Sequence, residues 1–444
     1  MLLRFTLKNW MSFRDEVVFS LVATKERQHG ARVPKLEKYR VRALPVAAIY
    51  GGNASGKTNL FDALRFAKYF VVRGFAPDEK IPCAPFALDD RSLGEASGFC
   101  FEILADECVY EFSFSATATA VLEEKLVQIS PASEKVLYRR CGDKSFESSL
   151  AKENPRLEFV FQGTQNNQLF LTNSVFQKLD CFRAVYDWFR TSLIIVGPDS
   201  RFGGFEHFLD ETSPLYGKMN ELLGRLDTGI DRVGGEAIPF ENMPIPPAEK
   251  DAVRRDLKEG ETFRFPGGGG RRFVVTRKDG NIFAKQLVSF HHTPSGKNVK
   301  FDIGSESDGS KRALDLLPAF LDLSIKNSKS VYVIDEVDRS LHTSLTRALI
   351  EMFLGGCSET TRAQLLMTTH DVLLMDQSIF RRDEMWLAER NREGVSSLTS
   401  LCEFKDVRYD RDLRKSYLQG RLGGVPRILL SGSSRGGLAG EVSE

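Results

Sequence analysis

The sequence has no long apolar run and only seven cysteines among its 444 residues. No stretch approaches the roughly 20 apolar residues that a membrane-spanning helix needs. The start, MLLRFTLKNWMSF, has charges within its apolar part and no signal-peptide cleavage site. The cysteines form no C-x-x-C pair and do not cluster with the six histidines. We therefore expect reduced, buried thiols, no zinc or disulfide framework, and a cytoplasmic protein without a membrane partner.

An excess of charge of either sign is also absent. Lys plus Arg number 61 and Asp plus Glu 60, so the whole chain is no polycation. Strong nonspecific binding of nucleic acid is therefore not predicted, although a local basic patch would permit some binding. Heptads long enough for a coiled coil and internal repeats are absent as well. The length and the 42% apolar content predict a soluble globular protein of two or three packed units.

One short stretch predicts a phosphate-binding loop. IYGGNASGKTNLFDAL fits the pattern G-x-x-x-x-G-K-[ST], between an apolar strand over 44–50 and a helix over 58–72. Its glycines let backbone N–H groups converge on an anion, and the helix start adds partial positive charge. Lys57 is expected to reach the outer phosphates, and the Thr58 hydroxyl to bind Mg²⁺. The residues expected to bind nucleotide in this loop are Gly51, Gly52, Asn53, Ala54, Ser55, Gly56, Lys57, Thr58 and Asn59.

A second stretch, KSVYVIDEVDRSLH, predicts the other half of a site. An apolar strand over 331–334 is followed directly by two acids. In a parallel sheet, ligands bind just beyond the carboxyl ends of the strands. Asp335 is expected to hold Mg²⁺ through water, and Glu336 to accept a proton from an attacking water molecule. The alternative, an acidic strand end facing solvent, is disfavoured by the phosphate loop in the same chain.

Two weaker elements add to this candidate site. A buried strand over 364–367 leads to His370 at the same edge as Asp335, where a histidine can hydrogen-bond a terminal phosphate. Taken alone, such a histidine is often structural. The stretch SDGSKR at 307–312 precedes a helix with an apolar face, and its hydroxyls and helix start suit a second anion site. Without further context, this stretch is equally well an ordinary helix N-cap.

The remaining patterns predict the domain organisation. Alternating apolar residues over 97–140, then LEFVFQ and QLFLT, predict an antiparallel lobe. Helical spacing follows, including a helix that begins at Ser213-Pro214, and strands and helices alternate again from residue 311 onward. The predicted units are a phosphate-loop half with the antiparallel lobe (1–172), a helical insertion (173–262), a half containing Asp335 and His370 (263–427), and a disordered tail (428–444).

The order of these elements resembles ABC-type ATPase heads, including SMC, RecF and OLD proteins. NWMSFRDEV, YGGNASGKTNL, ESDGSKR, IDEVDRSLH, TTHDVLLMD and YLQGRLGGVP together look like the stand-alone RloA-type ATPases of abortive-infection operons. These matches are spread from residue 9 to about 427. The resemblance implies an α/β fold: a P-loop NTPase with an ABC-type head, a parallel-centred sheet, an antiparallel β-lobe and a helical insertion.

The resemblance also implies a reaction. Two subunits would sandwich two molecules of ATP with Mg²⁺ and hydrolyse ATP slowly to ADP and phosphate, with Lys57, Glu336 and His370 as catalytic residues. Ser307 and Gly309, which match the L-S-G-G-Q signature only in part, would serve the nucleotide of the neighbouring subunit. Asp338 matches the family's D-loop. The Q-loop glutamine stays open among four candidates, which are Gln162, Gln165, Gln168 and Gln177.

Partners are implied in the same way. Members of this group act with a separately encoded effector, often a TOPRIM-fold nuclease. The chain would then be an antiphage sensor, triggered for example by a phage protein, whose ATP-bound homodimer or larger assembly controls that effector. Two alternatives stay open: a RecF- or SMC-like DNA-repair clamp, disfavoured by the missing coiled coil and positive charge, and a nucleotide-controlled scaffold that barely hydrolyses ATP.

Residues outside these motifs predict no second activity. Asp410 and Asp412 have the spacing of a metal site but lack a third carboxylate, and His291-His292 lacks a second ligand cluster. Four basic residues flank one strand. If they shared a face, they would suit binding of phosphate or of an acidic partner. Otherwise, they would be solvent-exposed charges that protect the edge of the sheet from pairing with other chains. They are Arg271, Arg272, Arg277 and Lys278.

Overall fold

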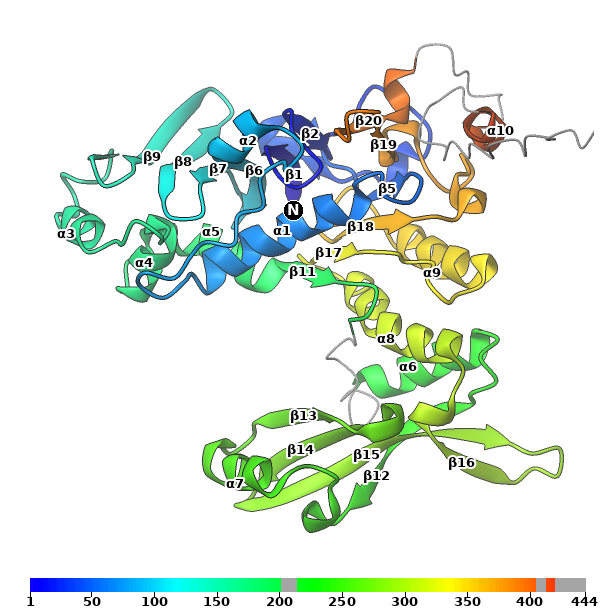
Figure 1. Cartoon of the computed structure of the whole chain (residues 1–444). Coiled ribbons are helices and arrows are strands. Elements are labelled where there is room, and N and C mark those ends of the chain that lie inside the picture. Colours follow the sequence, from blue (N-terminus) through cyan, green and yellow to red (C-terminus); the bar gives the residue numbers. More distant parts are fainter. Residues whose placement is uncertain (201–213, 405–412, 420–444) are drawn as a thin grey trace, which may run out of the picture.

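The computed structural model describes residues 1–200, 214–404 and 413–419. It contains a central six-stranded sheet, a seven-stranded antiparallel sheet beside it, and a five-stranded sheet that α6 and α8 separate from the centre (Figure 1). The predictions for Ser213, Asp410, Asp412 and the tail 428–444 concern residues outside the described part, and they stay predictions. The predicted α/β class, with a parallel-centred sheet and an antiparallel lobe, is confirmed.

The central sheet is parallel in all but its last strand. Its order is β11 (Leu193–Val196), β17 (Val331–Ile334), β18 (Gln364–Thr369), β5 (Val46–Tyr50), β19 (Met385–Arg390) and the antiparallel β20 (Ser396–Ser400). Helix α1 (Lys57–Val72) covers one face, whereas α8 (Asp308–Leu323) and α9 (Thr343–Gly355) cover the other. Ala47 and Ile49 therefore belong to one core, and Ala48 and Tyr50 to the other, which explains why the strands are apolar throughout.

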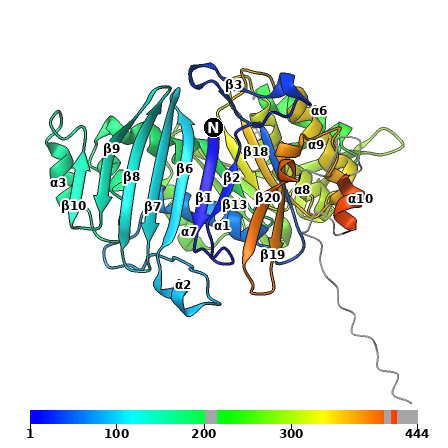
Figure 2. The same cartoon turned by 90° about the horizontal axis from the view of Figure 1, so that it is seen from above.

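The antiparallel lobe packs one face on α1. Its strand order is β10 (Ser145–Ser148), β9 (Ser133–Cys141), β8 (Val121–Ser130), β7 (Cys108–Ala116), β6 (Ser97–Ala105), β1 (Leu2–Lys8) and β2 (Val17–Ser20), and Figure 2 shows these strands side by side. Aromatic rings fill the inner face; the rings of Phe99 and Phe114 stack with centroids 4.9 Å apart. This alternation of inner apolar and outer polar residues is what the sequence predicted for 97–140.

Two predicted strands of this lobe are helices, so the prediction was wrong there. LEFVFQ forms α3 (Arg156–Gln162), with Leu157 and Val160 buried at helical spacing, and QLFLT leads into α4 (Phe170–Phe176). The buried carboxylate of Glu124 on β8 accepts hydrogen bonds from the N–H groups of Phe170 (2.6 Å) and Leu171 (2.9 Å). This contact fixes the start of α4 from a distant part of the chain, so a local pattern does not reveal it.

The predicted helical insertion over 173–262 is helical only in part. After α5 (Arg183–Asp187) and a π-helical turn over Trp188–Ser192, strand β11 joins the central sheet. Helices α6 (Pro214–Arg225) and α7 (Pro247–Asp256) flank β12 (Arg232–Ile238), which pairs with β15 (Asn281–His292). Strands β11 and β12 pair with strands far along the sequence, so local sequence patterns predicted only helices in this region. The shorter elements elsewhere are β3 (Lys35–Leu36), β4 (Val41–Arg42), α2 (Asp90–Gly94) and α10 (Leu413–Leu418).

The five-stranded sheet carries the predicted basic stretch. Besides β12 and β15 it contains β13 (Thr262–Pro266), β14 (Arg272–Lys278) and β16 (Asn298–Asp302). Arg272 is buried and pairs with Asp315 of α8 at 2.9 Å, whereas Arg271 pairs with Asp302 at 3.3 Å. Arg272 and Arg277 also face opposite sides of the strand. The four basic residues therefore do not form one surface for nucleic acid.

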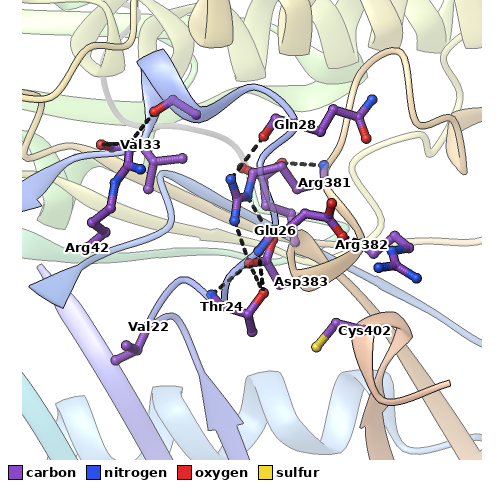
Figure 3. A network of polar contacts seen from close by, with 12 residues as sticks. Val22, Thr24, Glu26, Gln28, Val33, Arg42, Arg381, Arg382, Asp383 and Cys402 are labelled. Carbon is purple, nitrogen blue, oxygen red and sulfur yellow. Dashed lines mark hydrogen bonds and ion pairs between the residues drawn. The ribbon is translucent and has the colours of Figure 1, made fainter. Parts of the chain in front are cut away.

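A buried polar network joins the segment after β2 to the turn before β19 (Figure 3). Arg381 and Asp383 form a bidentate ion pair with N–O distances of 2.8 and 2.7 Å, and both are at most 2% exposed. Asp383 also accepts hydrogen bonds from the N–H (2.9 Å) and the hydroxyl (2.7 Å) of Thr24. Arg382 pairs with Glu26 at 2.8 Å. This network fixes the N-terminal segment beside the last parallel strand.

Replacing Asp383 by alanine is expected to lower the free energy of unfolding by about 3–5 kcal/mol, because it removes the carboxylate that pairs directly with the buried Arg381 guanidinium. Equilibrium urea unfolding measures the loss. Glu221→Ala is the control, because Glu221 and Arg225 form an exposed ion pair on α6 and its loss is expected to cost under about 1 kcal/mol. Equal costs for the two variants would refute the structural role of the network.

Candidate active site

Three parallel strands end at one edge of the central sheet, and each leads into a predicted site segment. β18 lies between β17 and β5, with Met367 opposite Ile334 and Thr369 opposite Tyr50. The loop after β5, the two acids after β17 and His370 after β18 therefore meet at this edge. The location agrees with the rule that ligands of parallel sheets bind beyond the carboxyl ends of the strands.

The loop after β5 needs glycine at two positions. Gly56 precedes α1 with φ of 105°, and a Cβ there would lie 2.5 Å from the Ser396 hydroxyl oxygen. A Cβ on Gly51 would lie 2.4 Å from the carbonyl oxygen of Ala388. The β19–β20 pair thus presses on the back of the loop, while Asn53, Ala54 and Thr58 are exposed. Backbone N–H groups at the start of α1 remain available to an anion.

Lys57 is folded back on its own loop. Its buried ammonium group donates hydrogen bonds to the carbonyl oxygens of Gly51 (2.8 Å) and Gly52 (3.1 Å). Burial lowers the pKa of Lys57 to about 8, although the carboxylates of Asp335, Glu336 and Asp338 oppose the shift. A phosphate group bound in the loop would supply a stronger, charged acceptor for this ammonium group.

The lowered pKa of Lys57 predicts a pH-dependent affinity for ATP. Bound phosphates favour the charged amine, so the pKa of Lys57 is expected to be higher in the complex than in the free protein. Above about pH 8 the free protein loses a proton that the complex keeps, so Kd is expected to rise with pH, by at most about tenfold per unit. Fluorescence anisotropy with a labelled ATP between pH 7 and 9.5 measures it.

Lys57→Arg is the control for this prediction, because an arginine stays charged throughout that pH range. Its Kd is expected to stay constant where that of the parent protein rises. A parent Kd that is equal at pH 7 and 9.5 would show that Lys57 does not titrate against bound phosphate.

The N-terminal NWMSF stretch supports the same loop. The amide of Asn59 donates to the Ser12 hydroxyl (2.7 Å), which also accepts a hydrogen bond from the Ser396 hydroxyl (2.7 Å). The indole N–H of Trp10 donates to the carbonyl oxygen of Asn59 (3.1 Å). Asn59 was predicted as a nucleotide-binding residue, whereas the residues that hold it were not. Their only sequence signal was the resemblance of the stretch to family members.

Asp335 is fully buried at the end of β17. The Thr368 hydroxyl donates to its Oδ1, while the same hydroxyl oxygen accepts the N–H of Glu336 at 2.8 Å. Among the described residues, Oδ2 of Asp335 has no hydrogen-bond partner. A buried carboxylate oxygen without a donor suits a cation or a bound water. With the exposed Thr58 hydroxyl it gives the all-oxygen donor set that Mg²⁺ prefers.

The sequence did not single out Thr368. Its hydroxyl donates to the Asp335 carboxylate and accepts the backbone N–H of Glu336. Both contacts depend on the register between β17 and β18. The only available signal was a hydroxyl residue at the end of a buried strand.

Glu336 lies between two basic side chains. One carboxylate oxygen is 3.8 Å from Nε2 of His370, and the other is 3.8 Å from the guanidinium of Arg339. Arg339 also pairs with Asp199 at 2.9 Å, and the N–H of His370 donates to Asp338 at 3.3 Å. The structure thus brings together Glu336, predicted as the base, His370, predicted to bond a terminal phosphate, and the D-loop residue Asp338; their chemical roles stay predictions. Arg339 was missed by the sequence reasoning.

Ser307 begins α8 as its N-cap. Its hydroxyl accepts the N–H of Ser310 at 3.0 Å, so the local N-cap interpretation of this stretch is confirmed. Gly309 packs on the segment after Asp338, where an added Cβ would lie 2.8 Å from the carbonyl oxygen of Ser340. That Ser307 and Gly309 contact the nucleotide of a neighbouring subunit stays a prediction.

The other sequence candidates lie away from this edge. The glutamines Gln162, Gln165, Gln168 and Gln177 lie in or beside α3 and α4, at the far end of the antiparallel lobe in Figure 1. His291 contacts Glu306 at 2.7 Å, and His292 contacts Asp231 at 2.8 Å. In the described part of the chain, no cluster of three or more His, Cys, Asp or Glu residues is placed to hold a metal ion. None of the helices described there has the length and apolar character to span a bilayer.

Comparison with known proteins identifies the region that carries this site. A family model described as "AAA domain, putative AbiEii toxin, Type IV TA system" matches residues 46–376. The chain is similar to the solved SMC head domain from Thermotoga maritima (16% identity, TM-score 0.36, 90% of this chain and 98% of that one). It is also similar to an SmcHead bound to the C-winged helix domain of ScpA (14% identity, TM-score 0.39, 90% and 97% covered). No curated protein matches the sequence. The family match includes the phosphate loop, both acids and His370.

Proposed function

The chain belongs to the AAA-domain family matched over residues 46–376, and on this premise we propose that it binds Mg-ATP between two subunits and slowly hydrolyses it to ADP and phosphate. The observation that carries the proposal is the meeting of the phosphate loop, Asp335, Glu336 and His370 at one edge of a parallel sheet. A phosphate loop alone would support binding only. A carboxylate beside it supplies the base that hydrolysis needs.

Each residue has a defined task in this mechanism. Lys57 and the loop N–H groups hold the outer phosphates, while Thr58 and Asp335 would hold Mg²⁺, which neutralises charge that develops on the phosphate oxygens. Glu336 accepts the proton of the attacking water. His370, whose Nε2 lies 3.8 Å from a carboxylate oxygen of Glu336, orients that water or the terminal phosphate in this proposal. The Thr368 hydroxyl bonds the Asp335 carboxylate and the backbone N–H of Glu336, so it holds these two neighbouring residues together without nucleotide.

Phosphate release by the purified protein tests the proposal. Release is expected to require Mg²⁺ and to fall by at least about 10²-fold in Lys57→Ala, because that variant lacks the cation for the outer phosphates. If the parent releases phosphate no faster than Lys57→Ala, the hydrolysis proposal fails. ATP binding that persists in that case would favour the nucleotide-controlled scaffold.

We further propose a cytoplasmic role as the ATP-dependent sensor of an antiphage system. The family description names a toxin of a type IV toxin–antitoxin system, and the motif resemblance to RloA-type ATPases points to abortive infection. The partner would be a separately encoded effector, a TOPRIM-fold nuclease, and the trigger a phage protein. Family membership and motif resemblance support this role, which goes beyond the site geometry.

Phage plating tests this role with the chain and the adjacent gene expressed together. The pair is expected to reduce plaque formation, and Lys57→Ala to restore it, while pull-down recovers the neighbouring protein with the parent. Full plaque formation with the parent pair would reject the defence role. ATP-dependent retention of duplex DNA without any partner would instead favour the DNA-repair clamp.

A further inference from the structure

The side chain of Arg312 on α8 contacts the backbone of the two acids of the site. One terminal nitrogen of its guanidinium lies 3.4 Å from the carbonyl oxygens of both Asp335 and Glu336. The other terminal nitrogen lies 3.4 Å from the carbonyl oxygen of Gly197, which follows β11. Arg312 therefore connects the helix that begins at Ser307 to the backbone of Glu336.

Within the described ranges, the buried guanidinium of Arg312 makes only long hydrogen bonds to backbone carbonyl oxygens. Arg312 is 6% exposed, the described residues offer its nitrogens only these backbone acceptors, and Nε has none. Burial lowers the pKa of this guanidinium. Burying a cation that makes only long contacts lowers the stability of the fold. Packing alone therefore does not explain an arginine at this position.

A second buried arginine provides the contrast. Arg140 on β9 is 1% exposed and also donates to three backbone carbonyls, at 2.9, 2.8 and 3.2 Å, on Gly142, Gln168 and Gln165. Its charge is further balanced by Glu124 at 3.6 Å. Arg140 is a well-paired structural residue of the lobe. Arg312 has the same kind of acceptors, with longer contacts, at the edge that carries the catalytic acids.

The backbone that Arg312 contacts is itself strained. Glu336 has φ of 50°, a left-handed conformation that is unfavourable for a residue with a side chain. Three contacts hold it: Thr368 accepts its N–H at 2.8 Å, and its carbonyl oxygen accepts the backbone N–H of Arg339 at 3.1 Å and the Arg312 guanidinium at 3.4 Å. Without Arg312, only the Arg339 N–H among the described residues holds this carbonyl oxygen, so the strained peptide relaxes more readily and the Glu336 carboxylate is held less firmly in its present position.

We infer that Arg312 is a positioning residue that holds the Glu336 backbone in the conformation needed for hydrolysis and ties it to the helix capped by Ser307. This inference rests on the proposed ATPase function. Because Ser307 and Arg312 lie on the same helix, a movement of the N-terminus of α8 also moves the contact on Glu336. Engagement of Ser307 by a neighbouring subunit's nucleotide thereby adjusts the base of this subunit's own site.

The test compares Arg312→Met and Arg312→Lys with the parent protein. Methionine keeps much of the volume and removes the donors, and it is expected to lower kcat by about 10²-fold with KM changed less than about twofold. Lysine supplies one cation to the same carbonyls and is expected to recover part of the lost kcat. Arg140→Lys is the matched control at a buried arginine far from the site, and its kcat is expected to equal that of the parent.

A readout without hydrolysis separates this inference from the proposed function. Hydrogen exchange of the peptide over 331–341 is expected to accelerate in Arg312→Met, while exchange over α1 stays unchanged. If the parent shows no turnover, the ATPase proposal fails, and the exchange still reports whether Arg312 holds Glu336. Unchanged exchange, a kcat within twofold of the parent, or equal losses of kcat and of ATP affinity would each overturn the inference.

Discussion

Glu336→Gln is expected to slow ATP hydrolysis by about 10³-fold while ATP stays bound, because the variant keeps the shape of the base and removes its ability to accept a proton. The phosphate loop and Asp335 are unchanged, so affinity for Mg-ATP is expected to stay close to that of the parent. The expected result is that phosphate release nearly stops while ATP is still recovered with the protein after filtration. Glutamine also keeps an oxygen for the contacts of His370 and Arg339.

The control for this variant is Glu351→Gln. Glu351 is an exposed acid on α9 that pairs with Arg347 at 2.9 Å, so the same chemical change there is expected to leave turnover unaffected. A Glu336→Gln protein that hydrolyses ATP at the rate of the control would remove Glu336 from the role of base. Loss of bound ATP as well as turnover would assign Glu336 to binding rather than to catalysis.

Mixing two inactive variants is expected to restore activity if the site is shared between subunits. Lys57→Ala removes a phosphate ligand, and Ser307→Arg places a large cation at the start of α8; each alone is expected to lose at least about 10²-fold in turnover. In a mixed dimer, one site combines both defects and the other combines two intact halves. With random pairing of a symmetric dimer, about one quarter of the parent turnover is expected to return.

The control mixture uses Lys57→Ala with the Lys57→Ala, Ser307→Arg double variant, which contains no intact phosphate loop and is expected to stay inactive. Ser307 is also the N-cap of α8, so the fold of Ser307→Arg is checked by thermal unfolding. No recovery in the first mixture, with both variants folded, would place Ser307 outside the neighbour's site.

Local signals predicted which segments lie at the edge of the central sheet. The phosphate loop, the acids after β17 and His370 each follow an apolar strand, and the parallel arrangement brings the ends of these strands together. The glycines at 51 and 56 were predicted for phosphate binding. The structure adds that the β19–β20 pair packs behind them, which no local pattern contains.

Long-range contacts explain the errors. QLFLT looks like a strand by composition, but the carboxylate of Glu124 on β8 holds the start of α4 as a helix. β11 was assigned to a helical insertion because its partner β17 lies far along the chain. Thr368 and Arg312 were missed for the same reason, since each acts on a segment distant in sequence. The residues predicted to bind nucleotide had local sequence signals, whereas the residues that contact them from distant segments did not.

The molar mass of Glu336→Gln by light scattering, with and without Mg-ATP, shows directly whether two subunits close over ATP. A mass that doubles only when Mg-ATP is present, and that stays at one subunit when Ser307→Arg is added to the same chain, is the predicted result. A mass that does not respond to Mg-ATP, in a protein that binds the nucleotide, would contradict the claim that two subunits close over ATP.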